Sequence, residues 1–323
     1  MTADILPPDP PVVLFAGPED ARAAYAEPLG KAAERAHLAL DLRMDPADAE
    51  AGEVDYLIFA ANGPVRAFDG FTRLKGILSL WAGVDGILKL DPPHDVPLVR
   101  MVEDGMTLGM VDYVMGHVLR HHLDIDRYID AEPVAVWEKD HPPLACSRHV
   151  GVLGLGALGA ACAQALSRHG FDVSGWSRSR KEIPGVTCRD GDEGLEQVIG
   201  EAEILVLLLP HTPDTERLID ADRIARMPEG AVLVNPARGP LIDHDALLAA
   251  LDAGRLRHAT MDVFDEEPLP EEHPYWRHPR VTVTPHIASA TRPETAAEAL
   301  VGQIARAERG EPFAHVVDRG RGY

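Results

Sequence analysis

The chain has 323 residues, of which 46% are hydrophobic, and it carries a formal net charge of −21. This length gives room for two domains of ordinary size, each with its own core. The negative charge argues against nucleic acid and against an anionic membrane as partners, because both are bound through a surplus of Lys and Arg.

Cysteine usage and the first residues indicate the compartment. Cys146, Cys162 and Cys188 show no CxxC spacing and give no even set for disulfides, so we expect reduced thiols. Residues 1–8 contain no basic segment followed by an apolar core, and no apolar run approaches the length that spans a membrane. We therefore expect a cytoplasmic protein without a targeting signal.

The first third of the chain alternates short apolar runs with helical or loop segments. Residues 17–37 predict a helix with an irregularity at Pro28. Strands are predicted at residues 12–16, 38–42, 56–60, 76–80 and 98–101. Such an alternation predicts a parallel sheet covered on both faces. Since no phosphate-binding glycine motif is present here, we expect a substrate domain.

The loop after the fourth of these strands contains Trp81, Ala82 and Gly83. Open α/β sheets bind ligands at the carboxyl ends of their strands, and a glycine leaves neighbouring backbone N–H groups approachable. A ligand-binding loop is therefore one interpretation. A glycine turn capped by Asp85 is the other, and the residues themselves leave both open.

A helix predicted over residues 106–124 leads into the second part of the chain. His117 and His121 stand one helical turn apart in it, a spacing that can hold a metal ion. Because no acidic third ligand lies in the same turn, we favour a structural or interface pair and expect no metal site. The following residues, 125–144, have only a loose pattern.

From residue 149 onward, strands and helices repeat. Six strands are predicted, at residues 149–154, 172–177, 204–209, 231–235, 258–263 and 281–285. This pattern fits the doubly wound dinucleotide-binding fold. A last helix, at residues 292–309, is not needed by that fold, so we expect it to return to the first domain.

The predicted fold class is α/β, with two Rossmann-like, doubly wound parallel-sheet domains and an active-site cleft between them. The substrate domain is flavodoxin-like and discontinuous, comprising residues 1–104 and 290–323. The second, dinucleotide-binding domain comprises residues 105–289.

A glycine-rich turn opens the second domain. The apolar run at residues 149–153 leads into Gly154, Leu155, Gly156, Ala157, Leu158 and Gly159, and an Ala-rich helix follows. Gly154 permits the tight turn, Gly156 leaves room for a pyrophosphate, and Gly159 lets helix and strand pack closely. The free N–H groups at the helix N-terminus favour an anion. The alternative, a tight turn without a ligand, is less favoured because the strand and the helix are both present.

The end of the next predicted strand indicates which dinucleotide is bound. NAD-specific sites place an Asp or Glu about 20 residues after the glycines, against the ribose 2′-OH. Here the residues are Trp176, Ser177, Arg178 and Ser179, followed by Arg180 and Lys181. Guanidinium and hydroxyl donors suit a 2′-phosphate, so we predict that NADP(H) is preferred and NAD(H) possible. A solvated basic turn is the alternative.

Three polar groups follow strand ends in the second domain, so they can converge at one edge of the sheet. Arg238 can hold an α-keto acid carboxylate and polarise the neighbouring carbonyl. His286 can protonate the carbonyl oxygen as hydride arrives, and Glu267 can hydrogen-bond the imidazole and favour its charged form. Taken singly, each residue has an ordinary surface or turn role. Their joint placement predicts a carbonyl reduction site.

These motifs together resemble the D-isomer-specific 2-hydroxyacid dehydrogenase family. The similarity rests on the glycine turn and on residues 235–239, 262–269 and 284–288. Residues 176–181, 276–281 and 317–323 are similar to its glyoxylate/hydroxypyruvate reductase A branch. The match is clearest from about Leu74 onward.

The resemblance implies an enzyme with Arg238, Glu267 and His286 as its catalytic residues, with Arg238 also binding substrate and His286 acting as acid and base. It implies a homodimer formed largely through the cofactor domains, and Trp81, Ala82 and Gly83 as the substrate loop. The remaining cofactor contacts that it implies are Leu209 and Pro210 at the adenine, Thr215 near the phosphates, Asp262 at the carboxamide, and Pro236, Ala237, His286 and Ala288.

The predicted activity is NAD(P)H-dependent reduction of small 2-keto acids, of the glyoxylate or hydroxypyruvate type. Trp81 stands where the branch has a smaller residue, and Pro236 fixes the backbone of the arginine motif. Two alternatives stay open: the same fold acting on a bulkier 2-keto acid that stacks on Trp81, or a non-catalytic dinucleotide-sensing corepressor scaffold. The complete catalytic set argues against the second.

Overall fold

The computed structural model describes residues 9–137 and 139–322. Residues 1–8, in which no targeting signal is expected, and Tyr323, at the end of the 317–323 motif, lie outside the described residues. The chain divides into two compact units, Met1–Gly105 with Thr291–Tyr323 and Met106–Ala290, called here the first and the second unit. Among the described residues, none of the helices combines the length and apolar character needed to cross a membrane.

The first unit contains a five-stranded parallel sheet of order β2-β1-β3-β4-β5. Its strands are β1 (Val12–Ala16), β2 (Asp41–Arg43), β3 (Tyr56–Phe59), β4 (Gly76–Ser79) and β5 (Leu98–Val99). Its helices are α1 (Glu19–Arg35), α2 (Asp85–Leu88) and α9 (Pro293–Glu308). The strands β1, β3 and β4 are almost completely buried, as the apolar runs predict for a sheet covered on both faces.

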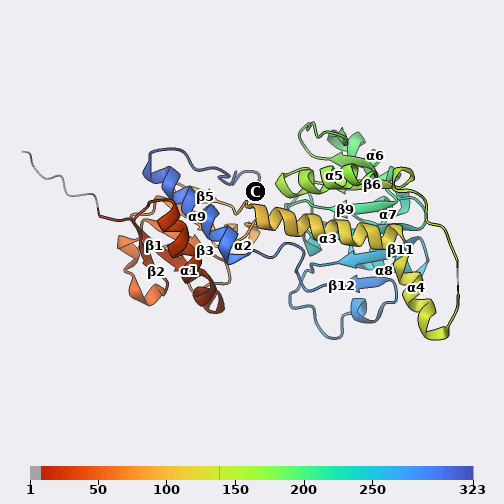
Figure 1. The fold of residues 1–323 in the computed structure, drawn as a ribbon, viewed down its shortest axis with the longest axis horizontal. Coiled ribbons are helices and arrows are strands. Elements are labelled where there is room, and N and C mark those ends of the chain that lie inside the picture. The colour runs from red at the N-terminus through yellow and green to blue at the C-terminus, as the bar shows by residue number, and fades with distance from the viewer. Residues whose placement is uncertain (1–8, 138, 323) are drawn as a thin grey trace, which may run out of the picture. The chain divides into compact units, whose positions relative to one another are not determined.

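The two long helices of this unit come from opposite ends of the chain. They pack side by side (Figure 1), and an ion pair of 2.9 Å joins Arg35 of α1 to Glu298 of α9. The last helix thus belongs to the first unit. The irregularity expected at Pro28 does not break the helix, because α1 continues through this residue.

The second unit contains a seven-stranded parallel sheet of order β12-β11-β10-β9-β6-β7-β8. Its strands are β6 (His149–Leu153), β7 (Asp172–Trp176), β8 (Thr187–Arg189), β9 (Ile204–Leu207), β10 (Ala231–Asn235), β11 (Leu256–Met261) and β12 (Val281–Val283). Its helices are α3 (Asp104–His122), α4 (Ile125–Ala131), α5 (Ala157–His169), α6 (Gly191–Glu201), α7 (Ala221–Arg226) and α8 (His244–Asp252).

The count of six strands predicted for this unit is wrong, because β8 adds a seventh at the edge of the sheet. Its three residues, Thr187, Cys188 and Arg189, include no apolar run that a pattern could detect. Part of the loosely patterned 125–144 segment forms the helix α4.

Alternate residues of the strands in the second unit face opposite layers of core. Val150 and Val152 of β6 pack in the layer that contains Val118 of α3 and Cys162 of α5. Leu153, by contrast, packs in the layer formed with helices α6, α7 and α8. This period of two, with apolar residues on both faces, is why the strands appear in the sequence as continuous apolar runs.

The order of strands reverses between β6 and β9. From β6 the sheet extends through β7 and β8 on one side, and from β9 through β10, β11 and β12 on the other. Strand ends on this second side lie level, since Asn235 pairs in register with Met261 and Met261 with Val283. Loops that follow these strands therefore leave the same edge of the sheet, where doubly wound folds bind ligands.

Candidate active site

The glycine turn between β6 and α5 has the backbone geometry of a dinucleotide-binding loop. Gly154 has a φ of +102°, and a Cβ there would lie 2.4 Å from the Leu208 carbonyl oxygen. A Cβ on Gly159 would lie 1.7 Å from the Gly154 carbonyl oxygen, so only glycine permits this approach of helix and strand. At Gly156, the N-cap of α5, no described atom lies within 4 Å of the added Cβ. The turn therefore leaves no room for a side chain at Gly154 or Gly159, whereas the space beside Gly156 is open.

The loop after β9 lies beside this turn. Leu208 donates its N–H to Leu153 at 2.7 Å, which ties the two loops together. Thr215 donates its hydroxyl to the Pro210 carbonyl at 2.7 Å and accepts the N–H of Thr212 at 2.8 Å. Leu209 is buried and Pro210 is half-buried. The hydrogen bonds of Thr215, the third predicted cofactor contact in this loop, stabilise the conformation of the loop.

The basic turn after β7 is exposed at Arg178 and Ser179 and buried at Ser177. The Ser177 hydroxyl donates to the Ser179 carbonyl at 2.7 Å, and the Trp176 indole N–H donates to the Gly191 carbonyl at 2.8 Å. These bonds fix the turn while its guanidinium stays at the surface. No sequence pattern indicated Asp214, whose carboxylate lies 4.0 Å from Arg178 Nη1.

The imidazole of His286 and the carboxylate of Glu267 are brought together. His286 Nδ1 and Glu267 Oε2 are 2.7 Å apart, and the other carboxylate oxygen accepts the Phe264 N–H at 2.9 Å. The His286 side chain is 52% exposed. Because Nδ1 is engaged with the carboxylate, Nε2 is the ring nitrogen left to face a ligand.

The arginine loop follows the neighbouring strand β10. Asn235 holds it by accepting the Ala237 N–H at 3.1 Å and donating to the Arg238 carbonyl at 2.8 Å. Pro236 and Ala237 are buried. A Cβ on Gly239 would lie 2.2 Å from the Phe264 carbonyl carbon, so the arginine loop packs directly on the loop that carries Glu267. The guanidinium of Arg238 also donates to the Ala237 carbonyl at 2.6 Å.

Asp262 is completely buried at the end of β11, with a carboxylate that accepts three hydrogen bonds. Its Oδ1 accepts the Thr284 hydroxyl at 2.5 Å and the Ile287 N–H at 3.0 Å, and its Oδ2 accepts the Ala288 N–H at 2.9 Å. Ala288 is itself 2% exposed. Asp262 and Ala288, both predicted as cofactor contacts, are thus joined by a hydrogen bond that stabilises the turn containing His286.

The predicted substrate loop belongs to the first unit. Ser79, at the end of β4, donates its hydroxyl to the Trp81 carbonyl at 2.8 Å and accepts the Trp81 N–H at 3.1 Å. Within the described part of the chain, the N–H groups of Ala82 and Gly83 donate no hydrogen bond. The loop is thus fixed at one end and offers two free donors. Nothing in the residue pattern had singled out Ser79.

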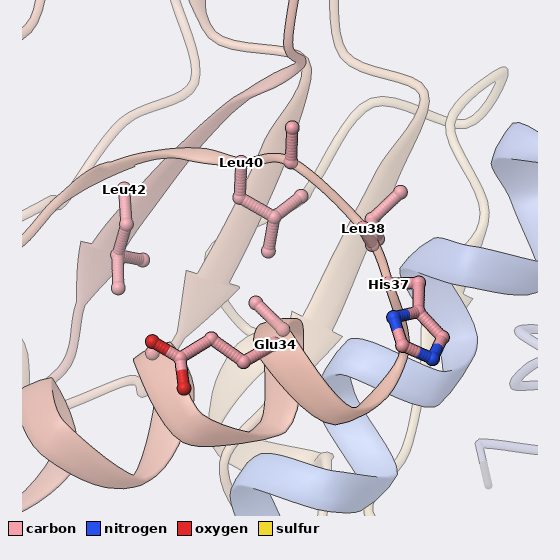
Figure 2. Close-up of a pocket in the computed structure, with 8 residues that line it drawn as sticks. Glu34, His37, Leu38, Leu40 and Leu42 are labelled. Atoms are coloured by element: carbon pink, nitrogen blue, oxygen red, sulfur yellow. The ribbon is translucent and has the colours of Figure 1, made fainter.

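A hollow of about 410 Å³ in the first unit does not lie at this loop. Figure 2 shows it between the end of α1 and the segment that leads into β2, with Leu38, Leu40 and Leu42 on one side and Glu34 and His37 on the other. It lies at the amino ends of the strands, whereas Trp81 follows a carboxyl end. Without Lys or Arg in its lining, it does not suit an organic anion.

His117 and His121, the pair that could have been read as metal ligands, belong to a buried polar cluster. Their ring centroids are 6.4 Å apart, and His121 Nε2 bonds Thr260 Oγ1 at 2.8 Å while its ring lies 5.0 Å from that of His258. Burial lowers the pKa of His121 to about 2 and that of His258 to about 4. Among the described residues, no group of three or more His, Cys, Asp or Glu side chains is arranged to hold a metal ion.

Known proteins resemble the chain over most of its length. The model of the family "D-isomer specific 2-hydroxyacid dehydrogenase, NAD binding domain" matches residues 113–288. Glyoxylate/hydroxypyruvate reductase A of Salmonella newport (strain SL254) is 41% identical over 266 residues, which are 80% of this chain and 85% of that protein.

Two solved structures have the same fold. One is a D-isomer specific 2-hydroxyacid dehydrogenase from Xanthobacter autotrophicus Py2 in complex with NADPH and MES, with a TM-score of 0.91 and 41% identity over 97% of this chain and 100% of that one. The other is an NADPH-dependent glyoxylate/hydroxypyruvate reductase from Sinorhizobium meliloti in complex with NADP and sulfate, with a TM-score of 0.87 and 34% identity over the same shares. The chain therefore belongs to the D-isomer specific 2-hydroxyacid dehydrogenase family, the NAD(P)-dependent oxidoreductases that its glycine turn and paired His286 and Glu267 predict.

Proposed function

We propose that the protein is an NADPH-dependent reductase of small 2-keto acids such as glyoxylate and hydroxypyruvate. The observation that carries the proposal is the 2.7 Å contact between His286 and Glu267, on loops that leave the same sheet edge as the Arg238 loop. The relatives named above, which are dehydrogenases and reductases, support catalysis over a corepressor role.

The second unit fits a dinucleotide. The open side of the turn at Gly156 leaves space for a pyrophosphate, and the first N–H groups of α5 would bind that anion. Arg178 would pair with a 2′-phosphate, and the relatives solved with NADPH or NADP support that preference. When bound, the reduced nicotinamide supplies the hydride.

The chain's own residues would do the rest of the reaction. Arg238 would bind the carboxylate of the keto acid and polarise its carbonyl. His286 would hold a proton at Nε2 and transfer it to the carbonyl oxygen as the carbon receives hydride, so the C=O becomes a CH–OH group. Glu267, bonded to Nδ1, would orient the ring and balance its charge. The free N–H groups of Ala82 and Gly83 would add donors for the carboxylate.

Steady-state NADPH oxidation tests this function. Glyoxylate, hydroxypyruvate and larger 2-keto acids should be compared in the wild type and in Arg238→Ala, with Arg238→Lys as the matched variant that keeps the charge without the planar fork. We expect activity with the small acids, a loss of about 100-fold or more in kcat/KM in Arg238→Ala, and partial activity in Arg238→Lys. Unchanged activity in Arg238→Ala would contradict the mechanism, and faster turnover of bulky acids would assign Trp81 a stacking role.

Cofactor preference has its own test. Arg178→Ala should raise KM for NADPH by about tenfold or more while KM for NADH changes little, because only NADPH carries the 2′-phosphate. Asp214→Asn is the matched control, since it removes the carboxylate beside the guanidinium and keeps the guanidinium. Equal effects of Arg178→Ala on both cofactors would refute the role of this residue.

We further propose a homodimer formed through the second unit. Large exposed apolar side chains gather in one stretch of it, and Trp137 is 96% exposed. The members of this stretch are Leu123, Ile125, Ile129, Val134, Val136, Trp137 and Leu144. Such a concentration is typical of a protein interface. Sedimentation of the wild type should give twice the monomer mass, and Ile129→Asp should give the monomer; a monomeric wild type at micromolar concentration would contradict the proposal.

A further inference from the structure

Asp262 accepts hydrogen bonds from three consecutive residues of the turn that presents His286. The backbone N–H of His286 donates to the Asp262 carbonyl at 2.8 Å, and the carboxylate of Asp262 accepts the Ile287 and Ala288 N–H groups at 3.0 and 2.9 Å. His286 itself has a φ of +54°, in the left-handed region. Because this conformation is unfavourable for a residue with a Cβ, the surrounding hydrogen bonds must maintain it.

A third donor to the same carboxylate leads out of the turn. Thr284 Oγ1 lies 2.5 Å from Asp262 Oδ1 and 2.7 Å from Tyr113 Oη. An ionised carboxylate only accepts, so the single hydroxyl proton of Thr284 points to Asp262. Thr284 must then accept from Tyr113, whose phenol is the donor that begins the chain Tyr113, Thr284, Asp262.

Tyr113 is a rigid starting point for this chain. It lies on α3, where Val114 and Val118 are fully buried against the sheet, and its ring centroid is 4.4 Å from that of His117. Burial raises the pKa of the Tyr113 hydroxyl well above its ordinary value, so the phenol keeps its proton at any working pH.

We propose that Tyr113 is a positioning residue for the reduction, which acts through the hydroxyl of Thr284 and the carboxylate of Asp262 to hold His286 in its left-handed turn. The inference rests on the proposed function and adds a residue that lies 171 positions before its partner in the chain. Its donation fixes the Thr284 hydroxyl toward Asp262 and thereby keeps three donors on a buried carboxylate. Without it, that hydroxyl is free to rotate away and the turn loses one of its supports.

Tyr113→Phe removes only the phenol oxygen. We expect kcat to fall about tenfold while KM for NADPH changes less than about twofold, because the imidazole is displaced whereas the glycine turn and Arg178, which would bind the cofactor phosphates, are untouched. Amide hydrogen exchange of the peptide containing Ile287 and Ala288 should become about tenfold faster, as both N–H groups depend on Asp262. This second readout needs no activity, so a failure of the proposed function is distinguished from a failure of this inference.

A double-mutant cycle tests whether Tyr113 acts through the hydroxyl of Thr284. Thr284→Val removes the intermediate hydroxyl and should lower kcat at least as much as Tyr113→Phe, and the double variant should be no worse than Thr284→Val. Thr284→Ser keeps the hydroxyl and should restore both kcat and exchange protection. Tyr56→Phe is the matched control, because Tyr56 donates to Glu308 at 2.5 Å in the first unit and its loss should leave both readouts unchanged.

Three results would overturn the inference. Unchanged exchange of the 287–288 amides in Tyr113→Phe would show that the turn does not depend on the phenol. An undiminished further effect of Tyr113→Phe in the Thr284→Val background would show that Tyr113 acts by another route. A comparable loss of kcat in Tyr56→Phe would show a general response to losing a buried phenol hydrogen bond.

Discussion

Replacing His121 by Gln should make the free energy of unfolding less sensitive to acid. His121 is 1% exposed and bonds Thr260, and His258 beside it is 8% exposed and bonds Thr282 at 2.9 Å. Burial is the main cause that lowers both pKa values, to about 2 and about 4, and for His121 the next causes are His258 and Arg257. The nearest acid is Asp126, whose Oδ2 is 3.8 Å from His121 Nδ1 and whose other oxygen is bound by Arg120.

The sign and size of the effect follow from proton linkage. Above about pH 6.5 both histidines are neutral in the folded and unfolded chain, so they add no pH dependence. Below about pH 6.5 the two histidines become protonated in the unfolded chain, whereas in the folded chain they stay neutral until the pH falls to their lowered pKa values. Stability is therefore lost as pH falls, by about 1.4 kcal/mol per unit for each histidine, which gives about 2 kcal/mol each at about pH 5.

Urea unfolding at a series of pH values between about 7 and 5 measures this dependence. His121→Gln lowers stability at every pH through lost packing, but its curve should be flatter than that of the wild type by about 2 kcal/mol over the range. His94→Gln, at an exposed histidine, is the control and should leave the slope unchanged. Parallel curves for wild type and His121→Gln would refute the assignment of a neutral buried imidazole.

Three further predictions concern the site itself. Gly159→Ala should destabilise the fold by about 3 kcal/mol in thermal unfolding, since its Cβ would meet a backbone oxygen at 1.7 Å, whereas Gly156→Ala should fold normally and bind dinucleotide about tenfold more weakly in a fluorescence titration. Glu267→Gln should lower kcat about 100-fold with little change in KM, because the imidazole loses its charged partner; equal kcat would contradict this role. Ser79→Ala should raise KM for the keto acid about fivefold in initial-rate assays, since both bonds to the Trp81 backbone are lost, and an unchanged KM would argue against a substrate loop there.

The sequence predicted what local pattern determines. The strands at 12–16 and 231–235 have the predicted bounds, because buried parallel strands are continuous apolar runs. The glycine turn was predicted because its spacing admits few backbone paths, and the structure shows the close approach at Gly159 that the pattern implies. The pairing of His286 with Glu267 followed from the rule that parallel strands end at one edge.

Other features had no local signature. The edge strand β8 is three residues long and carries no apolar run, so it was missed. Asp214 comes close to Arg178 only through the fold of the loop after β9, and Tyr113 reaches Thr284 across 171 residues. Ser79 could not be identified from the sequence because a serine at a strand end is common, and only its two hydrogen bonds to the Trp81 backbone distinguish it. Contacts of this kind depend on tertiary placement, which propensity and periodicity do not encode.

The reversal of strand order beside β6 separates two kinds of evolutionary change. The glycine turn and Arg178, proposed to bind the pyrophosphate and the 2′-phosphate, follow β6 and β7 on one side of the reversal, whereas Arg238, Glu267 and His286 follow β10, β11 and β12 on the other. Mutations that exchange one coenzyme for another can accumulate in the first group without moving an atom that handles the carbonyl. A change of preference between NADPH and NADH at Arg178 can therefore arise while the residues proposed to act on the keto acid stay in place.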